Sequence, residues 1–404
     1  AANLKSFGIK SAGKTVSGDP LQIVRDKVNR ISGPKTMKMF DKVNMVLGKG
    51  TARFVDARTV EVAGKQYTAK KIFIATGTEP FIPPIPGLDS VPRLTNMNLF
   101  AQKDIPKTLM VLGGGAIGSE MAQAFSRLGS KVTVVQMDPH LLPNGDEEAG
   151  RELEAAFEKE GIKVFNSVTV ERVEQKQGKI VTVTNRGTFR TDRILVATGR
   201  SPVLEPLALE NAGVKFGPRG ILVDQTMRTN VRHIYAVGDC NGLALLSHAA
   251  MHQGMLALMN AMLPLKKFKR KKFIVLWSVF TTPEVAQAGL TERQARERGL
   301  KCTVIKELYA DYGRTIADGK PEGFVKVLAN GRGKIYGVTI VGEAASEMIH
   351  EWVLAMQQGT GLFGILMMQH SFPTISLMNK RIAEKWMMNK MGSKFLRKMA
   401  KLMI

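Results

Sequence analysis

Alternating apolar and polar residues fill the segment 51–79, TARFVDARTVEVAGKQYTAKKIFIATGTE, which ends in the apolar run IFIATG. Alternation with a period of two is typical of half-buried strands, and Gly64 offers a turn between two of them. The segment predicts a small β-meander that leads into a buried strand. The following PFIPPIPGLD contains four prolines, which exclude regular helix and central strand, so we predict a linker over 80–89.

From Leu109 to about Val203 the pattern changes to strand, glycine loop, helix and strand, followed by a second helix, a hairpin-like stretch and the apolar run RILVATGR. This alternation is typical of a parallel sheet with crossover helices. Further along, ILVDQTMRTNVRHIYAVGD is rich in strand formers, and NGLALLSHAAMHQGMLALMNAML predicts a helix with an apolar face. From VLWSVFTTPEVAQAGLTE onward the pattern predicts an α+β region that runs to the C-terminus.

Two segments are near copies of each other: IFIATGTEP at 72–80 and ILVATGRSP at 194–202. Each places a buried strand before Ala-Thr-Gly and a later proline. The repetition predicts two related nucleotide-binding units, one of them interrupted by the other. The expected fold class is α/β, with two Rossmann-like dinucleotide-binding domains and an α+β domain at the C-terminal end.

The composition fits a globular protein of two or three domains, with 404 residues of which 44% are hydrophobic and 23% are charged. No stretch approaches the length of a membrane-spanning helix, and the first residues lack the apolar core of a secretory signal, so the expected location is the cytoplasm. The two cysteines, Cys240 and Cys302, form neither a disulfide framework nor a metal-binding spacing. The net charge of +23 favours anionic ligands, acidic partners or anionic membranes without specifying a fold.

A complete Gly-x-Gly-x-x-Gly fingerprint, GGGAIG, lies between the apolar run TLMVL and a helical pattern. Gly113 permits the tight turn, Gly115 lets the backbone approach a pyrophosphate, and Gly118 lets helix and strand pack closely. The helix that begins here offers free backbone N–H groups and a positive dipole end to the phosphates. Because the strand KVTVVQ follows at the right distance, the loop predicts a dinucleotide site rather than a plain tight turn.

At the end of that second strand stands Gln136, where an acidic residue would ordinarily hold the ribose 2′-hydroxyl. Its amide can bond a hydroxyl group and does not repel a 2′-phosphate. However, no Arg or Lys lies between Val132 and Pro139, and Asp138 is close. These residues favour NADH over NADPH.

A second motif, TNVRHIYAVGDC, ends a predicted strand with Gly238 and Asp239. A carboxylate at the C-terminal edge of a strand can accept hydrogen bonds from a polyol such as the ribityl chain of a flavin. The alternative is a turn in which Asp239 caps a helix. The two ATG segments in their expected places favour the flavin interpretation.

Together these residues resemble the flavoprotein pyridine nucleotide-disulfide oxidoreductases. The resemblance covers essentially the whole chain and rests on motifs in the family's order: IATGTEP, GGGAIGSE, ILVATGRSP, IYAVGD, FTTPEVAQAGLTE, GFVKVLA, YGVTIVGEAASEMIHEWVLAM and HSFPTIS. It implies FAD, NAD(P)H and a homodimer. The implied domains are a partial FAD-binding domain over 1–90, an inserted NAD(P)-binding domain over 91–203, a second FAD-binding segment over 204–268 and a dimerisation domain over 269–404.

The same resemblance assigns site residues. For NAD(P)H it implies the fingerprint residues and three others further along: Gly113, Gly115, Ala116, Ile117, Gly118, Glu120, Gln136 and Gly199. For FAD it implies residues after the two ATG strands and around the second motif: Thr76, Gly77, Arg200, Gly238, Asp239 and Ala249. Glu120 matches a helix carboxylate that in the family lies near flavin and nicotinamide.

Three departures from the family pattern limit the expected activity. The FAD-binding fingerprint and the CxxxxC redox disulfide that open the family's sequences are missing, so we expect an incomplete N-terminus, and upstream residues that restore the cysteines are one alternative. The family's catalytic His and its Glu partner are replaced by Phe372 and Leu377, and the role is not carried over to His370, which lies two residues before Phe372. The C-terminal cysteine pair of mercuric reductase is absent from KFLRKMAKLMI.

Other features have simpler explanations. His248 and His252 have the spacing of two metal ligands on a helix, but no third ligand accompanies them, so no metal site is expected. The run KKFKRKK is expected to be a solvated loop rather than a nucleic-acid site. The tail NKMGSKFLRKMAKLMI has the pattern of a basic amphipathic helix, which either makes peripheral contact with a membrane or packs on the dimer partner.

The expected function is therefore that of an FAD-dependent oxidoreductase that transfers hydride from NAD(P)H to flavin and onward to an acceptor. The sequence does not identify this acceptor, and a quinone, a small disulfide, a metal or a protein all stay open. It does not identify catalytic residues either. The alternative is a degenerate family member that keeps the NAD(P) site and acts as a non-catalytic dimeric binding module.

Overall fold

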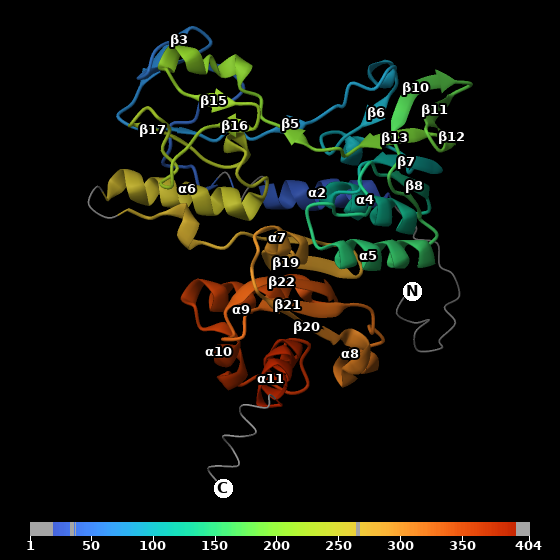
Figure 1. Ribbon diagram of the computed structural model, residues 1–404. Coiled ribbons are helices and arrows are strands. Elements are labelled where there is room, and N and C mark those ends of the chain that lie inside the picture. The colour runs from blue at the N-terminus through green and yellow to red at the C-terminus, as the bar shows by residue number, and fades with distance from the viewer. Residues whose placement is uncertain (1–18, 33–35, 37, 264–266, 393–404) are drawn as a thin grey trace.

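The computed structural model describes residues 19–32, 36, 38–263 and 267–392. Figure 1 shows two α/β parts in the upper half of the view and a third part, coloured orange to red, below them. The split part comprises residues 51–80 and 201–263. The inserted part comprises residues 81–200, and the C-terminal part comprises residues 274–392.

The inserted part is built on a parallel five-stranded sheet in the order β6-β13-β7-β8-β9. In this order the strands are Arg93–Leu94, Arg193–Val196, Thr108–Leu112, Lys131–Val135 and Lys163–Phe165. The crossover helices are α4 (Ala116–Arg127) and α5 (Glu147–Lys159). These elements confirm the predicted alternation of strands and helices.

Both faces of this sheet are covered, which explains why β7 reads TLMVL without alternation. Leu109 and Val111 pack with α4 and α5 on one face. Met110 and Leu112 face a second, antiparallel sheet on the other side. That sheet is the predicted hairpin-like stretch and consists of β10 (Val170–Lys176), β11 (Lys179–Thr184) and β12 (Gly187–Thr191).

The split part joins two segments that are distant in the sequence. β4 (Ile72–Ile74) pairs in parallel with β17 (Ile234–Ala236), with Ile72 opposite Ile234. The first segment also forms the predicted meander, whose antiparallel strands are β1 (Ala52–Phe54), β2 (Thr59–Val62) and β3 (Lys65–Thr68). The second adds β15 (Phe216–Gly217), β16 (Gly220–Ile221) and α6 (Ser247–Met262). The inserted part interrupts the two segments, as the repeated ATG pattern predicted.

The C-terminal part is the predicted α+β region. Its antiparallel sheet has the order β18-β19-β22-β21-β20, with strands Leu276–Val279, Glu284–Gly289, Ile335–Gly342, Phe324–Ala329 and Thr303–Leu308. The helices are α7 (Glu292–Glu297), α8 (Gly313–Ala317), α9 (Ala345–Gln358), α10 (Gly361–Met367) and α11 (Leu377–Met391). Trp352 is fully buried between the sheet and the helices, and its indole N–H donates to Asn379 Oδ1 at 2.7 Å.

A narrow link connects the split and inserted parts, because β5 (Glu79–Pro80) pairs antiparallel with β14 (Arg200–Ser201). The predicted linker ends earlier than residue 89, since Leu88 is fully buried in the core of the inserted part. Leu21 of α2 (Pro20–Ser32) also packs in that part, and Arg25 Nη1 donates to the Phe100 carbonyl at 2.9 Å. Residues before the predicted domain boundary at residue 90 therefore also pack on the inserted part.

Candidate cofactor-binding site

The fingerprint loop connects β7 to α4, and its three glycines meet three different constraints. Gly113 has φ +100°, and a Cβ there would lie 2.5 Å from the carbonyl oxygen of Ala197. A Cβ on Gly118 would lie 3.0 Å from the carbonyl carbon of Gly113. Around Gly115, in contrast, a Cβ would meet nothing within 4 Å. The loop is therefore tightly packed on the protein side and open at its middle glycine.

Helix α4 begins directly at this open glycine. Gly115 is its N-cap, and no side chain caps the first turn. Ala116 is exposed and Ile117 is half-buried, so the first backbone N–H groups lie at the surface beside the open glycine. An uncapped helix N-terminus with free N–H groups suits a pyrophosphate.

Gln136, the residue after β8, has a buried side chain that is already bonded within the protein. Its Oε1 accepts from the Gly114 N–H at 2.8 Å, and its Nε2 donates to Asp138 Oδ2 at 2.9 Å. The amide therefore holds the fingerprint loop against the end of β8. The contact of Gln136 with a ribose hydroxyl stays a prediction, and the neighbouring Asp138 is half-buried.

Glu120 lies one turn into α4 and is half-buried. Its Oε1 accepts from the backbone N–H of Phe280 at 2.9 Å, in the segment that follows β18. Burial raises the pKa of the Glu120 carboxyl, although the bond from Phe280 works in the other direction. The predicted carboxylate near the cofactors is thus also a contact to the C-terminal part.

The second predicted motif forms a cluster at the end of β17. Gly238 has φ +77°, and its N–H donates to Gln253 Oε1 of α6 at 2.9 Å. Asp239 Oδ2 accepts from the hydroxyl of Thr78 at 3.1 Å, and the same hydroxyl accepts from Arg200 Nε at 2.7 Å. Arg200 Nε also lies 3.8 Å from Asp239 Oδ2. The ends of β4, β14 and β17 therefore meet at one mostly buried carboxylate.

The other residues implied for FAD surround this cluster. Thr76 and Gly77 lie in the loop between β4 and Thr78, where Thr76 is exposed, and Ala249 is buried in the first turn of α6. Thr78 and Gln253 were not predicted, although both make the hydrogen bonds that hold the motif. Their places directly after ATG and on the helix after Gly-Asp were the available signals. Gly199 is exposed, and its carbonyl accepts from the Phe81 N–H at 3.0 Å.

The two positions that the resemblance implies for the family's acid–base pair carry apolar side chains on the C-terminal part. Phe372 is 82% exposed, and Leu377 is half-buried at the start of α11. The nearby His370 has a side chain that is 3% exposed, and its Nε2 lies 3.0 Å from Glu351 Oε1. Asn379 Nδ2 donates to the other oxygen of Glu351 at 2.8 Å. His370 is thus engaged with groups of its own chain.

The weaker sequence signals have ordinary surroundings. His248 Nε2 lies 2.7 Å from the Leu276 carbonyl oxygen, and the His252 ring packs on Phe273 at 4.3 Å. Among the residues that the structure describes, no three His, Cys, Asp or Glu side chains are arranged to hold a metal ion. None of the described helices combines the length and the apolar character needed to cross a membrane. Most of the predicted amphipathic tail, residues 393–404, lies outside the described residues.

Comparison with known protein families identifies the family to which this chain belongs. The family model described as pyridine nucleotide-disulphide oxidoreductase matches residues 8–254, and the model of its dimerisation domain matches residues 275–381. The chain belongs to the pyridine nucleotide-disulphide oxidoreductases. This confirms the predicted family, its fold class and its cofactors, FAD and NAD(P)H. The matched dimerisation domain supports the predicted homodimer.

Similar proteins in the family are oxidoreductases. The dihydrolipoyl dehydrogenase of Thermus scotoductus is 38% identical over 337 residues, which is 81% of this chain and 72% of that protein. The mercuric reductase of Bacillus cereus is 36% identical over 89% of this chain and 58% of its own length. The HOCl-induced flavoprotein disulfide reductase RclA of Escherichia coli superposes with a TM-score of 0.82 at 26% identity, covering 91% and 85% of the two chains. These comparisons support an enzyme and do not support the non-catalytic alternative.

Proposed function

We propose that this pyridine nucleotide-disulphide oxidoreductase takes a hydride from NADH and passes the electrons through FAD to an acceptor that exchanges no thiol with the protein. The observation that carries the proposal is the fingerprint loop, which is closed by packing at Gly113 and Gly118 and open at Gly115 beside an uncapped helix. In such an enzyme the cofactors supply the redox chemistry, and the protein supplies binding, orientation and electrostatics.

On the nucleotide side, α4 presents its first N–H groups to the pyrophosphate. Because both polar atoms of the Gln136 amide are bonded to Gly114 and Asp138, we assign the ribose contact to the carboxylate of Asp138. A carboxylate accepts from a 2′-hydroxyl but repels a 2′-phosphate, so this contact supports NADH over NADPH. Asp138→Asn is expected to reduce the difference in affinity between NADH and NADPH.

On the flavin side, Asp239 has the chemistry that a polyol chain requires. The carboxylate is 14% exposed and lies at the C-terminal end of β17, where doubly wound folds bind their ligands. Thr78 and Arg200 leave it free acceptor capacity, since they give the carboxylate one hydrogen bond from a hydroxyl and one longer ion pair. We therefore assign Asp239 to the ribityl hydroxyls and Arg200 and Thr78 to its support.

The choice of acceptor rests on two observations. One is the state of a buried thiol, and the other is the pair of side chains at the positions implied for the acid–base pair. Cys240 is buried with its Sγ 3.2 Å from the Val237 carbonyl, and burial raises the pKa of its thiol, which opposes thiolate formation. Phe372 and Leu377 can neither donate nor accept a proton. A quinone fits this arrangement, because it takes electrons from a reduced flavin and can take its protons from water.

The experiment compares acceptors after the protein has been loaded with FAD. NADH is mixed with the protein and either a water-soluble quinone or lipoamide, and NADH oxidation is followed by absorbance. We expect turnover with the quinone and none with lipoamide. Turnover with lipoamide alone would contradict the proposal. The cytoplasmic location and a membrane contact of the tail stay predictions, which fractionation of cells that express the protein would test.

A further inference from the structure

Besides the packing of α2, the described residues join the inserted part to the split and C-terminal parts through one narrow link and one broad contact. The link is the two-residue pairing of β5 with β14, supported by the Phe81 N–H that donates to the Gly199 carbonyl. A two-stranded connection of this length sets the orientation of a domain only loosely. The broad contact lies between α4 and α5 on one side and the C-terminal part on the other. This contact is what holds the inserted part in one orientation.

Gln123 lies at the centre of the α4 side of this contact and is 3% exposed. Its Oε1 accepts from the Thr282 N–H at 2.7 Å, and its Nε2 donates to the Thr282 carbonyl at 2.7 Å. The Nε2 also donates to Glu160 Oε1 at 2.9 Å. A single buried amide therefore pairs with both backbone groups of one residue in the C-terminal part, much as a neighbouring strand would.

The residues one turn before and one turn after Gln123 reach the same segment. Glu120 accepts from the Phe280 N–H at 2.9 Å, and Arg127 Nη1 donates to Thr282 Oγ1 at 3.1 Å. Positions 120, 123 and 127 share one face of a helix. Because α4 begins at the fingerprint loop, the helix that would hold the pyrophosphate is the same helix that is fastened to the C-terminal part.

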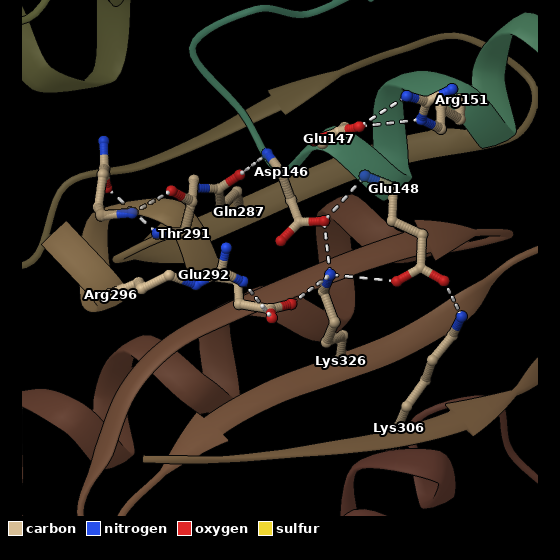
Figure 2. A network of polar contacts seen from close by, with 11 residues as sticks. Asp146, Glu147, Glu148, Arg151, Gln287, Thr291, Glu292, Arg296, Lys306 and Lys326 are labelled. Atoms are coloured by element: carbon tan, nitrogen blue, oxygen red, sulfur yellow. Dashed lines mark hydrogen bonds and ion pairs between the residues drawn. The ribbon is translucent and has the colours of Figure 1, made fainter. Parts of the chain in front are cut away.

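The start of α5 provides the other end of the contact, shown in Figure 2. The Asp146 N–H donates to Gln287 Oε1 at 3.0 Å. Lys326, 4% exposed, donates through its Nζ to Asp146 Oδ1 at 2.6 Å and to Glu148 Oε2 at 3.1 Å, and Lys306 pairs with the other oxygen of Glu148. Exchange of the Asp146 backbone N–H therefore reports whether this contact is intact, at a place that Gln123 does not touch.

We propose that Gln123 is a positioning residue, which fixes α4 on the C-terminal part and thereby sets where the bound NAD(P)H presents its hydride. This inference rests on the proposed function. The fingerprint loop is closed by contacts within the inserted part, so the affinity for NADH does not require Gln123. Hydride transfer does require it, because a misplacement of about 1 Å can lower the rate of a positioned reaction by about a hundredfold.

The test compares Gln123→Leu with the control Ala124→Gln, which changes an exposed neighbour on the same helix. Three quantities are measured on the FAD-loaded protein: the Kd for NADH by nicotinamide fluorescence, the rate of anaerobic flavin reduction by stopped flow, and amide exchange at Asp146. For Q123L we expect a Kd within about twofold of the wild type, a flavin reduction rate lowered at least about tenfold, and faster exchange at Asp146. A124Q is expected to match the wild type in all three.

An unchanged reduction rate and unchanged Asp146 exchange in Q123L would overturn the proposal, and so would a Kd that worsens in step with the rate. If Q123L does not fold, Arg127→Ala removes an outer bond of the same contact and is expected to give smaller changes in the same direction, while wild-type values for that variant would overturn the proposal. Failure of the proposed function would appear separately, as no flavin reduction in the wild type and A124Q alike. Exchange at Asp146 in Q123L would then decide whether Gln123 holds the contact.

Discussion

Replacing Gly118 with alanine tests whether the fingerprint loop is as tightly closed as its geometry indicates. A Cβ at this position would lie 3.4 Å from Val111 Cγ1, 3.0 Å from the carbonyl carbon of Gly113 and closer still to the carbonyl oxygen. The backbone of Gly113 cannot rotate away as a flexible side chain would, so α4 has to shift. Overpacking of this kind costs about 1–3 kcal/mol. We therefore expect the free energy of unfolding to fall by about 2 kcal/mol in G118A.

Gly115→Ala is the matched control, because the same methyl group enters open space. Nothing lies within 4 Å of a Cβ there, and φ is −73°, which any residue adopts. Its free energy of unfolding should stay within about 0.5 kcal/mol of the wild type. Its affinity for NADH should fall by about tenfold or more, since the methyl group occupies the space through which the pyrophosphate approaches the backbone.

Urea unfolding followed by circular dichroism measures the stability of both variants, and fluorescence titration measures the Kd for NADH. The geometry requires the two effects to separate: G118A loses stability, and G115A loses affinity. If G118A is as stable as the wild type, the contact between α4 and the loop accommodates a methyl group and does not require glycine at this position. If G115A binds NADH as tightly as the wild type, the pyrophosphate is not held at this glycine.

Three further predictions concern single side chains. Lys326→Met leaves the buried carboxylate of Asp146 without its cation, so the free energy of unfolding in urea should fall by about 3–5 kcal/mol. Adding Asp146→Asn should recover most of this stability. A fall of less than about 1 kcal/mol would contradict a stabilising buried ion pair. Burial raises the pKa of the Glu120 carboxyl, so its ionised form destabilises the fold at neutral pH. The Glu120→Gln variant should therefore have a Tm equal to or higher than that of the wild type at neutral pH. This gain in Tm should disappear below the ordinary carboxyl pKa, where Glu120 is protonated in both the folded and the unfolded state. A lower Tm of the variant at neutral pH would refute the prediction. Asp239→Asn should lower the FAD content of the purified protein, measured by absorbance after denaturation, whereas full content would exclude the assigned contact.

The features that the sequence predicted well are those whose cause is local. The turn at Gly113, the start of α4 at Ala116 and the apolar strand TLMVL depend on neighbouring residues, so the pattern of GGGAIG was sufficient to place them. The interruption of one unit by the other was also predictable, because the two ATG segments repeat on either side of the fingerprint. Family motifs then supplied the cofactors and the dimerisation domain.

The features that the sequence did not reveal depend on tertiary contacts. Gln136 stands at the expected position, but its amide turns to the Gly114 N–H, which no periodicity predicts. Gln123 meets a residue 159 positions away, and Lys326 meets one 180 positions away. Thr78 joins Arg200 across 122 positions. Such partners are chosen by the way the three parts of the molecule pack, so a single sequence carries little signal for them.

Hydride transfer from NADH to FAD is tested most directly by anaerobic mixing of the FAD-loaded protein with NADH while the visible absorption band of the flavin is recorded. We expect NADH to bleach the band and an added quinone to restore it. The same bleaching is expected in A124Q, and a loss of NADH affinity is expected in G115A. A flavin that is bound but keeps its full absorption in excess NADH would show that this hydride transfer does not occur.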